Sequence, residues 1–336
     1  GEERPIYNAH SYHTKVPHKA IMRYILHYTR PGDVVLDGFC GTGMTGIAAL
    51  LCGDRVAVQA LGYKVDADGS IYSKDEEDEA AEWKLFSKLG VRRAILNDLS
   101  PAASFIASCY NAPIKSDRFD EEARDILKSA DAECGWMYET MHVDGVSRGK
   151  INYTVWSEVF SCSECAGEVV FWNVAVDKEG GQVRDEFRCP HCAADLSKRS
   201  MERAWTSKFD TAIKETVKQI KQVPVLINYS LGGSRFEKTP DKFDIELIEK
   251  TEVANIPNWF PTNRINSGDE SDRLLRVGIT HVHHLFTRRN LAAFSSMYAR
   301  AQSPLAKLAL LGGYTVGLKT ARFLPLRWIQ KDTGPM

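Results

Sequence analysis

The sequence has few of the features that would place it in a membrane, on a secretory route or in a strongly basic class. No apolar run approaches the length needed to cross a bilayer, and we expect no secretory leader. Neither sign of charge is in excess, because 43 Lys and Arg stand against 44 Asp and Glu, a formal net charge of −1. Overall charge therefore does not indicate a nucleic-acid partner, although a local basic face remains open. We expect a soluble chain of about two or three domains.

The cysteines point to metal rather than to disulfides. Eight are present, and four of them form two CxxC pairs, Cys162 with Cys165 and Cys189 with Cys192. In a chain without a leader, this pattern favours a metal site and a reducing cytoplasm.

Two common nucleotide-binding motifs are absent. The chain lacks the G-x-G-x-x-G spacing at its first glycine-rich loop, and that loop has no phosphate-binding Lys. In their place, an apolar run from Val34 ends in an acid and is followed by a turn with three glycines, which ends at Gly43. Residues 44–51 then have a helical pattern. We predict the strand, glycine-rich loop and helix of a nucleotide-binding α/β unit, in which glycines let a ligand approach the backbone. The alternative is an ordinary turn without a ligand.

The order Asp-Gly-Phe-Cys-Gly-Thr-Gly in this loop resembles the Asp-Pro-Phe-x-Gly-Ser/Thr-Gly signature of DNA amino-methyltransferases. These enzymes methylate adenine N6 or cytosine N4 with S-adenosylmethionine. Gly38 stands where the family usually has Pro. The resemblance implies that the loop binds S-adenosylmethionine through Asp37, Gly38, Phe39, Cys40, Gly41, Thr42 and Gly43.

A polar segment lies just before the loop, in the place where the family has a His-x-x-x-Lys-Pro-like segment and a helix. It reads His-Thr-Lys-Val-Pro over residues 13–17, with Val16 as an extra residue before the Pro. The resemblance implies that His13, Thr14, Lys15 and Pro17 line the methionine end of the cofactor. The alternative is a polar N-terminal arm.

A second acid follows the next apolar strand. This strand ends in Asn97-Asp98, and Ser100 and Pro101 then suit the first positions of a helix. An acid at this place binds ribose hydroxyls in nucleotide-binding sheets, so Asn97 and Asp98 are candidates for the cofactor ribose. Asp98 lies further from the glycine-rich loop than is usual, and we attribute the extra length to an insertion over about residues 60–92. This insertion is predicted to hold an exposed acidic run, a small hairpin and a helix around Trp83. The alternative is that Asp98 only caps the helix.

The two CxxC pairs are separated by 23 residues that contain a strand-like segment, which is the pattern of a zinc ribbon. We predict that Cys162, Cys165, Cys189 and Cys192 bind a structural Zn²⁺ and that His191 is not a ligand. A redox CxxC would need a helix after a thioredoxin-like strand, and a strand follows Cys165 instead.

The last third mixes aromatic and basic residues. Trp259 is a candidate for base stacking, and Arg288 and Arg289 for phosphate contacts at the start of a helix that Thr287 caps. Three histidines, His281, His283 and His284, invite a metal hypothesis, but no carboxylate lies at a companion spacing, so a packed or phosphate-facing cluster is preferred.

The four-residue Asp/Asn/Ser-Pro-Pro-aromatic motif of the family is missing, because no two prolines are adjacent. We therefore assign no catalytic residue and expect the motif beyond Met336, in which case the chain is a fragment and inactive alone. The expected fold is α/β, with a half-built Rossmann-like sheet in residues 1–145, a zinc ribbon in 146–205 and an α+β recognition region in 206–336. An open sheet edge is expected where a fourth strand would pair.

The resemblance implies a site-specific DNA methyltransferase that acts on a base flipped out of double-stranded DNA. It uses S-adenosylmethionine and works in the cytoplasm without a membrane, with partner subunits of a modification or defence system as a further expectation. Two alternatives stay open. One is an RNA methyltransferase with a zinc ribbon. The other is a non-catalytic, zinc-ribbon nucleic-acid-binding protein whose Rossmann-like half is a relic.

Overall fold

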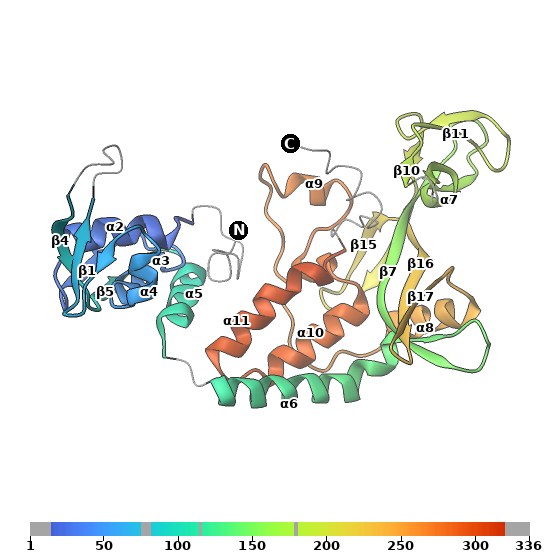
Figure 1. Ribbon diagram of the computed structural model, residues 1–336. Coiled ribbons are helices and arrows are strands. Elements are labelled where there is room, and N and C mark those ends of the chain that lie inside the picture. Colours follow the sequence, from blue (N-terminus) through green and yellow to red (C-terminus); the bar gives the residue numbers. More distant parts are fainter. Residues whose placement is uncertain (1–14, 75–81, 114–115, 178–180, 320–336) are drawn as a thin grey trace. The chain divides into compact units, whose positions relative to one another are not determined.

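A computed structural model describes residues 15–74, 82–113, 116–177 and 181–319 (Figure 1). The chain mixes helices and sheets and divides into two compact units. Unit 1 comprises residues 1–123 and 302–312, and unit 2 comprises residues 124–301 and 313–336. The boundaries expected from the sequence, at residues 145 and 205, both fall inside unit 2.

Unit 1 is built around two parallel strands, β1 (Val34–Asp37) and β5 (Arg93–Leu96), which pair with Val34 opposite Arg93 (Figure 1). Helices α2 (His18–Tyr28) and α3 (Met44–Leu51) contribute most of the buried core on one face of this pair. The other elements of unit 1 are α4 (Arg55–Gln59), β2 (Lys64–Val65), β3 (Ser70–Ser73), β4 (Lys84–Lys88), α5 (Pro101–Asn111), the first turns of α6 (Ser116–Cys134) and most of α11 (Pro304–Gly313).

The parallel pair is covered on one face in the described part of the chain. Val35 and Ala94 pack against the core, whereas Val34, Leu36 and Ile95 on the opposite face are exposed. Among the described strands, β1 pairs with β5 alone. Parallel sheets normally bury both faces, so this open apolar face is unusual for a parallel sheet.

The insertion after α4 forms the antiparallel sheet β2-β3-β4, which agrees with the expected hairpin. The predicted helix around Trp83 is wrong. Trp83 directly precedes β4, which pairs with β3 from Ser73–Lys84 to Ser70–Lys88. Burial of Ile71 and stacking of Phe86 on Tyr63, with ring centroids 4.9 Å apart, hold this sheet on the core. The acidic run over residues 75–79 lies outside the described residues.

Unit 2 is organised by a long strand, β7 (Arg148–Ser161), which pairs with β16 (Gln222–Leu231) in a six-stranded antiparallel sheet of order β13-β7-β16-β17 (Figure 1). Strands β6 and β8 also pair with β7. The remaining strands and helices of unit 2 before residue 205 are η1 (Gly135–Tyr138), β6 (Glu139–Met141), β8 (Glu168–Val170), α7 (Phe171–Ala175), β9 (Val176–Asp177), β10 (Gln182–Val183), β11 (Glu186–Arg188), β12 (Asp195–Ser197) and β13 (Glu202–Arg203). Those after it are β14 (Trp205–Asp210), β15 (Glu215–Ile220), β17 (Ser234–Lys238), α8 (Lys242–Val253), α9 (Asp272–Leu275), η2 (Val282–Leu285), α10 (Arg288–Arg300) and η3 (Tyr314–Gly317).

Local signals in the sequence set several helix ends. Thr287 accepts a hydrogen bond from the Asn290 N–H and caps α10, and Ser100 caps α5 with Pro101 behind it, both as predicted. None of the helices in the described part of the chain combines the length and the apolar character that crossing a bilayer requires.

Candidate functional site

The glycine loop joins β1 to α3. Gly41 and Gly43 have φ angles of +52° and +81°, in the left-handed region that favours glycine. A Cβ on Gly43 would also lie 2.8 Å from the Ala107 Cβ of α5. The close approach of α5 therefore explains why residue 43 is a glycine. At Gly38, by contrast, a Cβ would meet open space, so steric crowding does not require a glycine at this position.

Two carboxylates hold this loop from adjacent strands. Asp37, at the end of β1, accepts hydrogen bonds from the Phe39 N–H at 3.1 Å and the Thr45 hydroxyl at 2.5 Å. Asp98, two residues beyond the end of β5, accepts from the Gly41 N–H at 2.8 Å and the Ser100 N–H at 2.9 Å. The N–H groups of Ser100 and Gly41 hold the pKa of Asp98 below its usual value, so this carboxyl is ionised at neutral pH.

Asn97 links the two strand ends. Its backbone donates to the Asp37 carbonyl and accepts from the Cys40 N–H, both at 2.9 Å, and its side chain donates to the Gly38 carbonyl at 3.2 Å. Burial and the nearby Asp37 and Asp98 raise the pKa of the Cys40 thiol, which stays protonated. The predicted residues from Asp37 to Gly43 thus form one hydrogen-bonded unit with Asn97 and Asp98.

The surroundings of the loop suit a ligand without phosphate. Carboxylates accept hydrogen bonds from hydroxyl or cationic groups and repel phosphate. Phe39 and Leu99, which follow the two strands, are 91% and 94% exposed. Thr42 is buried, and its Oγ1 has no hydrogen-bond partner among the described residues. A ligand with a sugar, a flat ring and a positive centre fits this combination.

The predicted segment before α2 is described in part. His13 and Thr14 lie outside the described residues. The Lys15 ammonium lies over the Tyr110 ring of α5, 6.0 Å from its centroid, and burial lowers the Lys15 pKa. Pro17 is the N-cap of α2, and its carbonyl accepts from the Ala20 N–H at 3.0 Å. Lys15 therefore lies beside the helix that packs on Gly43.

The four cysteines of the CxxC pairs converge in unit 2. Their sulfur atoms all lie within 4.8 Å of one another, and the Cys162–Cys192 and Cys165–Cys189 Sγ distances are 3.8 Å. All four are free thiols. Their cluster packs on a small core that includes Phe160, Val169 and Phe187. This geometry suits one tetrahedral metal ion.

The two knuckles repeat the same backbone geometry. Ala166 and Ala193, one residue after each second cysteine, have φ angles of +55° and +58°. Both donate to the carbonyl of the first cysteine of their pair at 3.0 Å. Backbone N–H groups of Cys192 and His191 lower the pKa of the Cys189 thiol to about 6, whereas burial and the neighbouring sulfur atoms raise the pKa of Cys165 and Cys192, so the four thiols share their protons unequally.

His191 is turned away from the four sulfur atoms. Its Nε2 lies 2.9 Å from the Glu168 carbonyl oxygen, and it is not part of the four-cysteine cluster. The other four cysteines, Cys40, Cys52, Cys109 and Cys134, are buried, as expected for small apolar residues.

The arginines proposed as phosphate contacts are used inside unit 2. Arg288 donates to the Ala254 carbonyl at 2.8 Å. Arg289 donates to the Thr154 hydroxyl at 2.7 Å and lies over the Tyr138 ring. These interactions join α10 to its neighbours, and the phosphate contacts of Arg288 and Arg289 stay a prediction. Trp259 is exposed, with one face near Tyr298, and stays a candidate for base stacking.

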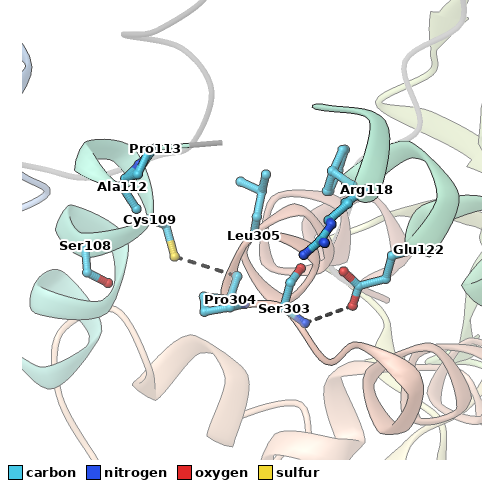
Figure 2. Close-up of a pocket in the computed structure, with 10 residues that line it drawn as sticks. Ser108, Cys109, Ala112, Pro113, Arg118, Glu122, Ser303, Pro304 and Leu305 are labelled. Atoms are coloured by element: carbon cyan, nitrogen blue, oxygen red, sulfur yellow. Dashed lines mark hydrogen bonds between the residues drawn. The ribbon is translucent and has the colours of Figure 1, made fainter. Parts of the chain in front are cut away.

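A cavity of about 410 Å³ in unit 1 lies among α5, the start of α6 and the start of α11 (Figure 2). Its wall is mainly apolar, and none of the predicted cofactor residues lines it. The Glu122 carboxylate at its edge accepts from the Gln302 and Ser303 N–H groups at 2.7 and 2.8 Å. Glu122 therefore serves as a cap for α11.

Sequence reasoning missed Asn111, which supports the loop from α5. Its amide donates to the Gly43 carbonyl at 3.3 Å, and a Cβ on Gly46 would collide with it. An Asn at a helix end has many roles, so the sequence carried no specific signal for this one.

The family model N6_N4_Mtase, described as DNA methylase, matches residues 2–68. This stretch contains the whole glycine loop but not Asp98. No curated protein and no solved structure matches the chain. The match supports an amino-methyltransferase family over this short N-terminal region, and with it methyltransferase activity in general.

Proposed function

We propose that this chain is the cofactor-binding part of an S-adenosylmethionine-dependent DNA methyltransferase that acts on an exocyclic amine of adenine or cytosine. The observation that carries the proposal is the pair of carboxylates, Asp37 and Asp98, at the carboxyl ends of two adjacent parallel strands, joined by a hydrogen-bonded glycine loop. Ligands of α/β sheets bind at this end of the strands. The family match over the same loop supports the choice of methyl transfer.

In this proposal, S-adenosylmethionine supplies a methyl group on a positively charged sulfur. Asp98 accepts hydrogen bonds from the ribose hydroxyls, and the exposed Phe39 and Leu99 contact the flat base of the cofactor. Lys15 and Pro17 lie on the methionine side. The chain's own contribution is orientation of the cofactor, which is a large part of catalysis when two reactants must meet in line.

The DNA substrate is a base flipped out of the duplex, with the exposed Trp259 as the candidate stacking surface. No catalytic residue is assigned in this chain, because the sequence contains no adjacent prolines. Cofactor binding is therefore a more direct test of the proposal than turnover.

We also propose that the four-cysteine cluster binds one structural Zn²⁺. Four thiolates complete a tetrahedral shell and leave no position for substrate, so this ion would stabilise β7, β8, β11 and β12 rather than take part in methyl transfer.

Calorimetric titration with S-adenosylhomocysteine tests the cofactor site. The wild-type chain should bind, and Asp98→Ala should weaken binding by at least about tenfold, because a charged hydrogen-bond partner is lost. Asp68→Ala is a matched control in the same unit, since Asp68 also accepts from the N–H two residues on, at 3.0 Å, but lies in the β2–β3 turn. The Asp68→Ala variant should bind S-adenosylhomocysteine with the same affinity as the wild type. Equal binding by all three proteins would contradict the assignment.

Transfer of labelled methyl groups to duplex DNA and to structured RNA, measured with the product of the full-length gene, then tests the substrate. Labelling of DNA amines supports the proposal. Labelling of RNA alone would redirect it to the alternative of an RNA methyltransferase.

A further inference from the structure

A second group of metal-ligating side chains lies in unit 2, away from the cysteines. It consists of Asp210, His283 and His284. Asp210 ends β14, and the two histidines lie next to each other on η2, 73 and 74 residues further along the chain. No carboxylate lies near the histidines in the sequence, but the fold brings one to them from the distant strand β14.

The three side chains converge on one point. The Nε2 atoms of His283 and His284 each lie 2.7 Å from the same oxygen, Oδ2 of Asp210. One potential ligand atom from each residue lies within 4.8 Å of the other two, and all three side chains are buried. Because both imidazoles approach the same carboxylate oxygen, one ion bound at this point would be within reach of all three side chains.

Second contacts fix the orientation of the group. The Ala212 N–H donates to Asp210 at 2.9 Å, and His284 Nδ1 lies 3.4 Å from both the N–H and the hydroxyl oxygen of Thr280. Metal-binding histidines commonly donate their second ring N–H to an oxygen, and the Thr280 hydroxyl is the oxygen within reach of His284 Nδ1. The Nδ1 of His283 is buried and has no hydrogen-bond partner among the described residues.

The charge of the group also favours a cation. Among the ion pairs of the described residues, Asp210 pairs only with these two imidazoles. No Lys or Arg of the described residues pairs with this buried carboxylate, and buried charges in proteins are paired or bind metal.

We propose that Asp210, His283 and His284 bind one divalent transition-metal ion, with Zn²⁺ as the first choice, at a site separate from the four cysteines. Imidazole nitrogen and carboxylate oxygen are ligands that Zn²⁺ accepts, and the absence of thiolate distinguishes this site chemically from the cysteine cluster. The proposal does not depend on methyltransferase activity.

Metal binding here needs no oxidant. Each Nε2–H proton moves to the Nδ1 of the same ring, and the freed Nε2 lone pair binds the ion beside Asp210 Oδ2. At His284, a hydrogen bond from Nδ1–H to the Thr280 hydroxyl then replaces the one that the Thr280 N–H donates to Nδ1. The Nε2–Oδ2 distances then lengthen from 2.7 Å to about 3.3 Å, the separation of tetrahedral ligands with bonds of about 2.0–2.1 Å. The ion would join the end of β14 to the turn that leads into α10.

Cobalt(II) loading of the metal-free wild-type protein tests the site. A thiolate site gives strong sulfur-to-cobalt charge-transfer absorption, and a site of nitrogen and oxygen ligands does not. We expect two bound equivalents per chain, of which one lacks this absorption. A single equivalent that is entirely thiolate-bound, or none, would overturn the proposal. A single equivalent without charge-transfer absorption would support it and would instead argue against metal on the cysteines.

Elemental analysis of variants completes the test. Asp210→Asn and His284→Gln should each lower the zinc content by one equivalent, with the charge-transfer absorption of the cobalt form unchanged. His281→Gln is the matched control, because His281 belongs to the same segment but contributes no ligand atom to the group. It should keep the full metal content. An unchanged content in Asp210→Asn, or an equal loss in His281→Gln, would contradict the proposed ligands, while the wild-type cobalt spectrum stands even if a variant fails to fold.

Discussion

At the scale of single residues, Arg92 is the most demanding side chain of unit 1. It is fully buried and donates to the carbonyls of Thr29, Lys88 and Gly90, with the shortest contact at 2.7 Å. It also donates to the hydroxyls of Thr29 and Ser87. The guanidinium therefore joins the end of α2, the end of β4 and the approach to β5. Burial lowers its pKa, but an arginine stays charged at any working pH.

Arg92→Lys should destabilise unit 1 by about 2–4 kcal/mol, because an ammonium cannot reach all of these acceptors and leaves buried carbonyls unpaired. Hydrogen exchange measured on peptides from α2 and β4 reports this loss as reduced protection. Arg93→Lys is the control, since Arg93 is the next residue and is exposed. Equal protection in both variants would argue against this role.

At the scale of elements, the contact between η1 and α10 closes unit 2. The Tyr138 hydroxyl donates to Asn290 at 2.9 Å, and Cys134, Met137, Leu291 and Ala292 form a shared apolar cluster. Burial raises the pKa of Tyr138 to about 12. The folded state therefore binds this proton more tightly than the unfolded state, whose tyrosines ionise near pH 10.

The contribution of Tyr138 to stability should be complete below pH 10 and should disappear as the pH rises from about 10 to 12. In urea unfolding, Tyr138→Phe should be less stable than the wild type at pH 8 by about 1 kcal/mol, the typical value of a lost hydrogen bond. The difference between the two proteins should then change in favour of Tyr138→Phe by on the order of 2 kcal/mol toward pH 12. A constant difference across this range would contradict a buried phenol.

Features set by neighbouring residues could be predicted from the sequence, and features set by distant residues could not. The caps at Ser100 and Thr287 depend on residues a few positions apart, and the structure shows them. The four CxxC sulfurs converge although their two pairs are separated by 23 residues, because each pair is a local turn and the spacing of the two pairs is itself a metal-binding pattern. The cofactor residues of the glycine loop remain a proposal, although the loop itself lies between a strand and a helix as expected.

The misses have a common physical cause. Asp210 meets His283 through a fold that joins residues 73 positions apart, and the helix predicted around Trp83 gave way to pairing of β4 with β3. The contact of the Arg289 guanidinium with Thr154, 135 residues away, could not be predicted from the sequence for the same reason.

At the scale of the whole molecule, the open face of the β1–β5 pair is the feature that sets behaviour in solution. Leu36 is 72% exposed, whereas its neighbour Val35 packs on the core of unit 1. Exposed apolar strands with an unpaired edge are sites of association between chains.

Leu36→Lys should therefore change the stability of unit 1 by less than about 0.5 kcal/mol and should reduce self-association of the purified chain. Val35→Lys places the same charge in the core and should prevent folding of unit 1. Sedimentation velocity measures the first effect, and thermal unfolding the second. A loss of stability in Leu36→Lys as large as in Val35→Lys would mean that this face is covered.

The wide spacing of the contacts that close unit 2 sets an order of events on the ribosome. The largest buried cluster of unit 1, with the strand residue Ala94 that packs on it, is complete once residue 94 has emerged, and α11 joins unit 1 later. Unit 2 closes only when α10 reaches Thr154 and Glu133, which lie 135 and 163 residues earlier. Elements η1 and β7 must therefore wait, with the apolar face around Met137 uncovered, while the chain between them and α10 is translated. Slow or paused translation before residue 300 would lengthen this exposure, and chaperones that bind apolar segments would act on unit 2 rather than on the core of unit 1.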